Sequence, residues 1–377
     1  MIKRILYTLL IMFPVVASAQ INTDRVMAIG RNALYFEDYV LSIQYFNQVI
    51  NAKPYLSDPY FYRGLAKINL DDFQGAESDC SEAIERNPFV VSAYQVRGLA
   101  RIQQNNFAGA IEDYTKALEF APENIGVWHN MALCRIRQED YKGAKNDLDK
   151  LIAISPRYTK AYLMRGEVDL KQKDTLAAEK DFGKAIEIDR YDADTWASRA
   201  ILRLQQQRYK DAEADFDHAI RLSTRNSGVY INRALARYHQ NNLRGAMSDY
   251  DIALDIDPNN FIGHYNRGLL RAQVGDDNRA IQDFNFVIEM EPDNMMAIFN
   301  RGLLLDQTGD YKGAIKDYST VINEYPNFLL GYQYRAQARR KIGDVKGADA
   351  DEFKVLKAQL DKQNGVDPNK QTADNTE

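Results

Sequence analysis

Proline recurs at a fixed spacing in this chain of 377 residues. Seven prolines lie at multiples of 34 residues from one another, namely Pro54, Pro88, Pro122, Pro156, Pro258, Pro292 and Pro326. A repeat of this length is typical of a solenoid, in which each unit buries its apolar face only against its neighbours. We therefore expect a row of small, similar units rather than a domain built around one central core.

Residues 295–328 show what one unit contains. Apolar or small residues recur at helical spacing in both halves, first at Ile298, Gly302 and Leu305, and then at Ala314, Tyr318, Val321 and Tyr325. Two amphipathic helices are predicted, joined near Gly309. The small residues Gly302 and Ala314 should lie where the helices cross, since larger side chains would hold the backbones apart. Pro326 should end the second helix because it lacks a backbone N–H.

This pattern resembles the tetratricopeptide repeat, a helix-turn-helix unit of 34 residues with the motif W-x2-L-G-x2-Y, A-x3-F and P. The aromatic position holds Tyr60, Tyr94, Trp128, Tyr162, Trp196, Tyr230 and Tyr332, with His264 and Ile298 as departures. The glycine position holds Gly30, Gly64, Gly98, Gly166, Gly268 and Gly302, or Ala132, Ala200, Ala234 and Ala336. The alanine position holds Ala76, Ala110, Ala144, Ala178, Ala212, Ala246, Ala280, Ala314 and Ala348, with Ser42 in the first unit.

Ten units follow one another without gaps over residues 20–362. They begin at Thr23, Ser57, Val91, Ile125, Thr159, Ala193, Ser227, Phe261, Met295 and Leu329. The resemblance implies an all-α fold, a right-handed α-solenoid. Arg190 and Thr224 replace proline at its position, and we expect the preceding helix to run on slightly there.

The first nineteen residues are typical of a secretory signal peptide. Lys3 and Arg4 precede an apolar run over residues 5–16, and the sequence Ala-Ser-Ala ending at Ala19 is a cleavage site. The run is short for a membrane span, which needs about 20 residues, so we expect a mature chain from Gln20 that is not an integral membrane protein. No cysteine follows the run to carry a lipid anchor. The polar tail, residues 363–377, is predicted to be disordered.

Charge and cysteine content narrow the class of partner. Loss of the signal peptide removes two basic residues and changes the formal net charge from −5 to −7, which disfavours nucleic acid as a partner. Cys80 and Cys134 fall in the second and fourth units, too far apart for a disulfide. N-x-[ST] sequences are missing. Together with the signal peptide, this favours a bacterial envelope or periplasmic protein.

Arginine stands just before the glycine position, where the family pattern has leucine. The arginines are Arg63, Arg97, Arg165, Arg199, Arg233, Arg267, Arg301 and Arg335. An aspartate follows each after sixteen residues, at Asp79, Asp113, Asp181, Asp215, Asp249, Asp283, Asp317 and Asp351. Because a guanidinium can bind a carboxylate with two hydrogen bonds, we predict a ladder of Arg–Asp pairs. The alternative is a row of unpaired arginines that binds a polyanion.

Two units break this pairing rule. The first has Ile29 and Tyr45 at the two positions, and the fourth has Met131 opposite Asp147. Either a neighbouring base such as Arg165 binds the carboxylate of Asp147, or the fourth unit is locally looser.

The first helices of tetratricopeptide arrays line a concave groove that binds peptides or helices, which the resemblance implies here. The position one residue after the aromatic position varies widely along the chain. The position one residue after the glycine position is mostly leucine, which we expect to serve partly for packing between adjacent first helices. Units seven to nine combine these positions into a candidate apolar patch of Ile231, Leu235, Tyr238, Tyr265, Leu269, Phe299 and Leu303. Asn232, Asn266 and Asn300 could hydrogen-bond a ligand backbone there. The family's carboxylate clamp is not supported, since its positions hold Met27, Phe61, Arg31 and Leu65.

Catalytic and cofactor motifs are missing from the sequence. Its four histidines lie in different units, and no H-E-x-x-H or Cys/His cluster accompanies them. G-x-S-x-G and phosphate-binding glycine motifs do not occur. We therefore expect no catalytic residue, metal or cofactor, and instead a scaffold that binds a protein or peptide. An assembly chaperone and a structural subunit of an envelope complex are the alternatives, and the oligomeric state stays open.

Overall fold

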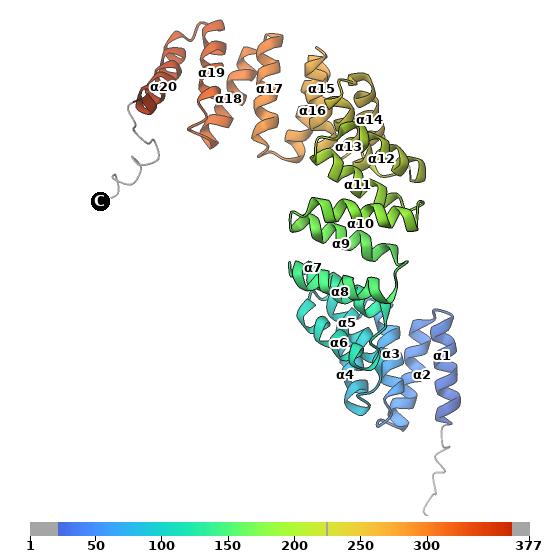
Figure 1. Cartoon of the computed structure of the whole chain (residues 1–377). Helices are drawn as coiled ribbons and strands as arrows, with labels where there is room; N and C mark the ends of the chain where they lie inside the picture. Colours follow the sequence, from blue (N-terminus) through green and yellow to red (C-terminus); the bar gives the residue numbers. More distant parts are fainter. Residues whose placement is uncertain (1–21, 224, 364–377) are drawn as a thin grey trace, which may run out of the picture. The chain divides into compact units, whose positions relative to one another are not determined.

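The protein is an all-α solenoid of helix-turn-helix units (Figure 1). A computed structural model describes residues 22–223 and 225–363, which contain 20 helices and no strand. The predicted signal peptide at 1–19 lies outside these residues, as does the polar tail apart from Gln363, which ends the last helix. None of the described helices is long and apolar enough to cross a membrane.

Each unit contributes two helices in alternation. The first helices are α1 Thr23–Tyr35, α3 Asp58–Ile68, α5 Val91–Gln103, α7 Ile125–Arg137, α9 Thr159–Lys171, α11 Ala193–Gln205, α13 Ser227–His239, α15 Phe261–Gln273, α17 Met295–Thr308 and α19 Leu329–Lys341. The second helices are α2 Tyr39–Ala52, α4 Phe73–Arg86, α6 Phe107–Phe120, α8 Tyr141–Ile154, α10 Thr175–Ile188, α12 Tyr209–Leu222, α14 Leu243–Ile256, α16 Asp277–Met290, α18 Tyr311–Glu324 and α20 Val345–Gln363. The first helices begin within one residue of the predicted unit starts.

The turn inside every unit contains one residue in the left-handed region. The last three units use glycine there, with φ of 93° at Gly309, whereas the first seven use other residues, such as Glu139 at 61°. An aspartate or asparagine commonly follows and caps the second helix. Asp140, for example, accepts a hydrogen bond from the backbone N–H of Gly143. This combination reverses the chain direction in three residues.

The two helices of a unit approach closely at the glycine position, as expected. A Cβ added at Gly302 would lie 2.9 Å from the ring of Tyr318, sixteen residues later. Ala314 is fully buried beside it. The residue sixteen positions after the glycine position is large or apolar and buried in the first nine units, and in the tenth it is the exposed Glu352.

The expectation that helices run on where proline is missing is wrong. α10 and α12 end at Ile188 and Leu222, two residues before the proline position, as the second helices do in units that have proline. The side chain at the aromatic position gives a physical reason for this common end point. Its polar group donates a hydrogen bond to the backbone carbonyl of the residue at the proline position. Trp196 donates to the carbonyl of Arg190 at 3.0 Å, as Tyr162 does to that of Pro156 at 3.1 Å. Any residue can supply that carbonyl.

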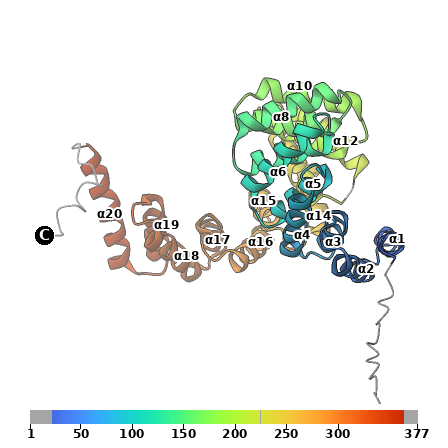
Figure 2. The ribbon, with the colours of Figure 1, turned by 90° about the horizontal axis from the view of Figure 1, so that it is seen from below.

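The chain forms two compact parts, one ending at Asp181 and the other beginning at Phe182. Some consecutive first helices contact one another within each part, α1 with α3 and α3 with α5 in the N-terminal part, and α11 with α13, α15 with α17 and α17 with α19 in the C-terminal part. Figure 2 shows the C-terminal series from α17 to α20. The surface lined by the first helices is called the first-helix face below.

Candidate functional site

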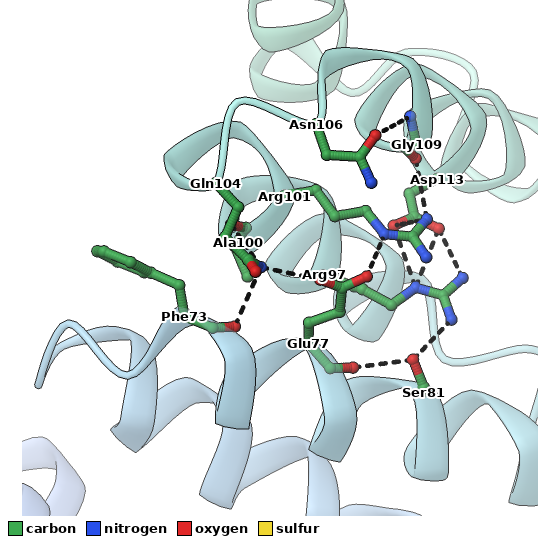
Figure 3. Close-up of polar contacts among 10 residues, drawn as sticks. All are labelled: Phe73, Glu77, Ser81, Arg97, Ala100, Arg101, Gln104, Asn106, Gly109 and Asp113. Atoms are coloured by element: carbon green, nitrogen blue, oxygen red, sulfur yellow. Dashed lines mark hydrogen bonds and ion pairs between the residues drawn. The ribbon is translucent and has the colours of Figure 1, made fainter.

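The predicted Arg–Asp ladder is confirmed, and each pair joins the two helices of one unit. Arg233 donates from Nε and Nη2 to the two carboxylate oxygens of Asp249 at 2.9 and 2.6 Å. Figure 3 shows the same contact between Arg97 and Asp113. All eight pairs predicted from the sequence form, and their aspartates are buried.

The ladder arginines also connect neighbouring units. In most units the remaining nitrogen, Nη1, donates to a polar residue sixteen positions earlier on the preceding second helix. Examples are Arg97 to Ser81 at 3.1 Å and Arg233 to Asp217 at 2.7 Å. Six of the eight guanidinium groups also stack on the ring at the aromatic position, with Arg199 lying 5.0 Å from the ring of Trp196. Because the ladder arginines are engaged on several sides and their side chains are at most 22% exposed, the polyanion-binding alternative gains no support.

A second row of cations, four residues after the ladder arginines, escaped the sequence analysis. Arg101 Nη1 lies 3.0 Å from the second oxygen of Asp113, and its Nε binds Glu77 of the preceding unit at 2.8 Å (Figure 3). Gln104 also donates to Glu77. The other second-row cations that bind their unit's aspartate are Lys67, Arg135, Arg203, Arg237, Arg271 and Arg339. The sequence could have revealed this second row, since basic residues recur at that position with the 34-residue period.

The fourth unit uses its second-row cation in place of the missing ladder arginine. Arg135 Nε lies 2.8 Å from Asp147 Oδ2. The alternative that Arg165 binds this carboxylate is wrong, because Arg165 binds Asp181 and Asp149 instead. Burial raises the pKa of Asp147, and Arg135 offsets this only in part. Asp147 thus has one ion-pair partner, whereas Asp113 of the preceding unit has two.

The aspartate of the eighth unit, Asp283, has more hydrogen-bonding partners than Asp147 of the fourth unit. His264 replaces the aromatic residue and places Nδ1 3.0 Å from Asp283 Oδ1, beside Arg267 and Arg271. Burial alone would raise the pKa of Asp283, but hydrogen bonds from His264 and Arg267 and the charges of both arginines hold it below its usual value.

The candidate apolar patch divides into buried and accessible residues. Ile231 and Phe299 are each only 7% exposed and belong to the core, where Phe299 packs on Tyr318, Phe328 and Tyr334. Tyr238, Tyr265, Leu235 and Leu303 are half-buried, and Leu269 is 39% exposed. The variable position that suggested recognition is therefore mostly packed, whereas the leucine position carries the more accessible side chains.

The accessible leucine position forms a stripe along the first-helix face of each compact part. Leu65, Leu99 and Leu133 belong to the N-terminal part, and Ile201, Leu235, Leu269 and Leu303 to the C-terminal part. Glu167 interrupts the series in the fifth unit. Leu99 and Leu269 are almost equally exposed, at 38% and 39%.

Polar groups lie beside this stripe in units seven to nine. Asn300 donates to the hydroxyl of Tyr265 at 3.2 Å and so connects adjacent first helices. Burial raises the pKa of Tyr265, and the hydrogen bond from Asn300 opposes this. Asn232 and Asn266 are half-buried, and no hydrogen bond of either side chain occurs within the described part of the chain.

An apolar cavity of about 410 Å³ opens beside Phe299. Met295, Met296 and Phe299 line it from the start of α17, and Val321, Tyr325 and Phe328 line it from α18 and the following loop. Met296 and Tyr325 are more than half exposed. The accessible edge of Phe299 thus faces a hollow large enough for an aliphatic or aromatic side chain.

The sequence matches models described as tetratricopeptide repeat over residues 91–124, 125–158, 159–192, 198–261 and 265–327. The structure is similar to a tetratricopeptide repeat protein from Parabacteroides merdae, with 21% identity, a TM-score of 0.52, and coverage of 66% of this chain and 98% of that chain. It is also similar to the C-terminal part of a TPR repeat-containing protein from Cytophaga hutchinsonii, with 17% identity, a TM-score of 0.52, and coverage of 63% and 97%. These structural likenesses show the fold alone. No curated protein matches the sequence.

Proposed function

The chain belongs to the tetratricopeptide repeat family, and from that premise we propose that it is an exported, non-enzymatic scaffold that binds a peptide or protein on its first-helix face. The observation that carries the proposal is the accessible leucine stripe beside Asn232 and Asn266 in units seven and eight. Leu269 is exposed and Leu235 is half-buried, so part of each apolar side chain is accessible to a partner. Side-chain amides beside them can hydrogen-bond a peptide backbone.

Units seven to nine are the proposed centre of binding. Leu235 and Leu269 supply apolar contact area, and Tyr265 adds an aromatic ring already fixed by Phe284 and Asn300. A ring held in one orientation loses little entropy on binding, so it can serve as an anchor. The cavity beside Phe299 would accept an apolar side chain of the same partner.

Leu235→Glu with Leu269→Glu tests this proposal. Both changes place charge on the stripe without touching the buried ladder, so helical content and the unfolding midpoint should persist. We expect partners recovered by affinity purification from the cell envelope to be lost with this double variant. Leu99→Glu is the matched control, because Leu99 occupies the same position in the N-terminal part and is as exposed as Leu269. Equal recovery of every partner by the double variant and the wild type would refute the proposed face.

A periplasmic assembly chaperone and a structural subunit of an envelope complex are alternative functions of the same surface. A chaperone would bind many unfolded proteins weakly, whereas a scaffold would copurify with one or two folded partners. The number and folded state of the recovered proteins therefore decide among these functions.

A further inference from the structure

The last helix, α20, differs from every other second helix in length. α20 has 19 residues, whereas the others have 14. The preceding second helices stop two residues before the proline position, but in the tenth unit that position is Leu360 and the helix continues to Gln363. Three apolar residues follow its outer side at helical spacing. Phe353, Leu356 and Leu360 are 67%, 53% and 48% exposed and are called the α20 stripe below.

Leu356 occupies a position that joins units elsewhere in the chain. The nine preceding units have isoleucine or leucine at that position, and each of these side chains is buried or half-buried. Ile322, for example, is 3% exposed and lies against Gly331 of the following unit. α20 is the last helix of the described chain (Figure 1), so Leu356 has no such cover.

Phe353 shows that the stripe is not shaped for an eleventh unit of the same kind. The matching position in the other units is Asn47, Ser81, Thr115, Asp149, Gly183, Asp217, Asp251, Asn285 or Ser319. Several of these accept a hydrogen bond from the ladder arginine of the next unit, as Ser319 does from Arg335. A phenylalanine cannot accept that bond. The aromatic ring therefore replaces a contact between units with an apolar surface found at this end alone.

We propose that α20 binds α20 of a second copy, antiparallel and about a two-fold axis near Phe353, so that the two Phe353 rings meet and Leu356 of each copy lies against Ala350 of the other. The charges on α20 are self-complementary in that arrangement, because Asp349 lies four residues before Phe353 and Lys357 four residues after it. Asp349 of each copy then faces Lys357 of the other. Both side chains are exposed, and Arg340 binds only Oδ1 of Asp349. A two-fold contact repeats each favourable pair twice.

A closed dimer fits the two ends of the chain better than an open filament. Gly331 packs against Ile322 of the preceding unit. The position that matches Gly331 holds proline, alanine, valine, threonine or glycine in units two to ten, and it is buried in each of them. The same position in the first unit is the exposed Arg25. The first unit therefore cannot pack against Leu356 of another copy in the way that a following unit packs against the preceding one. An isologous contact through α20 leaves no free end to propagate.

Sedimentation velocity of the purified full chain tests the proposal. We expect a dimer at micromolar concentrations and a monomer for Phe353→Asp, with unchanged helical content and unfolding midpoint. Tyr35→Asp, at an exposed aromatic residue of the first unit, should leave the dimer intact. A monomeric wild type, or a dimer that persists in Phe353→Asp, would overturn the proposal.

Charge exchange tests the orientation. Asp349→Lys and Lys357→Asp should each weaken self-association by about tenfold, an amount equal to about 1.4 kcal/mol. The double variant should restore it, because the pairs re-form with reversed charges. Phe353→Cys should also give a disulfide-linked dimer on oxidation, since Cys80 and Cys134 are both buried and free. Failure of the double variant to recover affinity, together with failure of the cysteine to crosslink, would rule out the antiparallel arrangement.

Discussion

Lys145 and Asp169 form the same link between adjacent units as Glu77 and Arg101, with the charges exchanged. Lys145 Nζ lies 2.5 Å from Asp169 Oδ1, and Arg101 Nε lies 2.8 Å from Glu77 Oε1. Both pairs join a second helix to the first helix of the next unit, 24 residues later. Asp169 is only 1% exposed. The fifth unit thus keeps the contact while reversing its polarity.

Reversal of the charge at Asp169 alone should be destabilising, whereas reversal of both charges of the Lys145–Asp169 pair should be tolerated. Asp169→Arg would bring two cations together at a buried position, and we expect a loss of about 2 kcal/mol, less than for a fully buried pair because Lys145 is partly exposed. Lys145→Glu with Asp169→Arg recreates the Glu77–Arg101 arrangement and should recover most of that loss. Urea unfolding of Asp169→Arg, of Lys145→Glu and of the double variant gives the coupling energy. Additive losses in the double variant would show that the two side chains do not interact.

The sequence could predict which residues pair but not which face is exposed. The 34-residue period places Arg233 and Asp249 in contact because both positions repeat together in eight units. The burial of Ile231 and the exposure of Leu269 depend instead on how one first helix is rotated against the next, which no single unit encodes. The same limit explains why the variable position looked like a recognition surface.

The left-handed turn position offers a gain in stability in the first seven units. Glu139 has φ of 61°, where a side chain with Cβ is strained. Glu139→Gly should raise the unfolding free energy by about 0.5 kcal/mol, since relief of strain is partly offset by greater freedom of the unfolded chain. Gly309→Ala, at φ of 93°, should lower it by about 1 kcal/mol. Asn105→Gly is the control and should change little, because asparagine tolerates this conformation. Equal effects at 105 and 139 would contradict this explanation.

Asp283 should make the eighth unit sensitive to acid. Its pKa in the folded chain lies below its ordinary value because hydrogen bonds and charges from His264, Arg267 and Arg271 outweigh burial. A lowered folded pKa gives stability that is present above the unfolded pKa of about 3.9 and is lost as pH falls through the folded pKa. Asp283→Asn should therefore be most destabilising near neutral pH, and its difference from the wild type should shrink below about pH 4. Urea midpoints measured across this range test the prediction, and a constant difference would oppose it.

Met131→Arg should strengthen the fourth unit. Burial raises the pKa of Asp147, so its ionised form costs stability at neutral pH, and that cost is relieved as pH falls below the raised folded pKa. An arginine at 131 could bind Asp147 and stack on Trp128, as Arg199 binds Asp215 at 2.8 and 2.9 Å while stacking on Trp196. Its long apolar stem would cover part of the surface that Met131 now covers.

We expect Met131→Arg to raise the unfolding free energy at neutral pH by about 1 kcal/mol. It should also move the pKa of Asp147 downward, so that the ionised carboxylate costs less stability above its unfolded pKa. Met131→Leu keeps an apolar side chain of similar size and should leave the pH dependence unchanged. If Met131→Arg destabilised the chain at neutral pH by more than Met131→Leu, the contact between Arg135 and Asp147 would already satisfy the buried carboxylate. The absence of a ladder arginine would then reflect packing around Met131 rather than a missing charge.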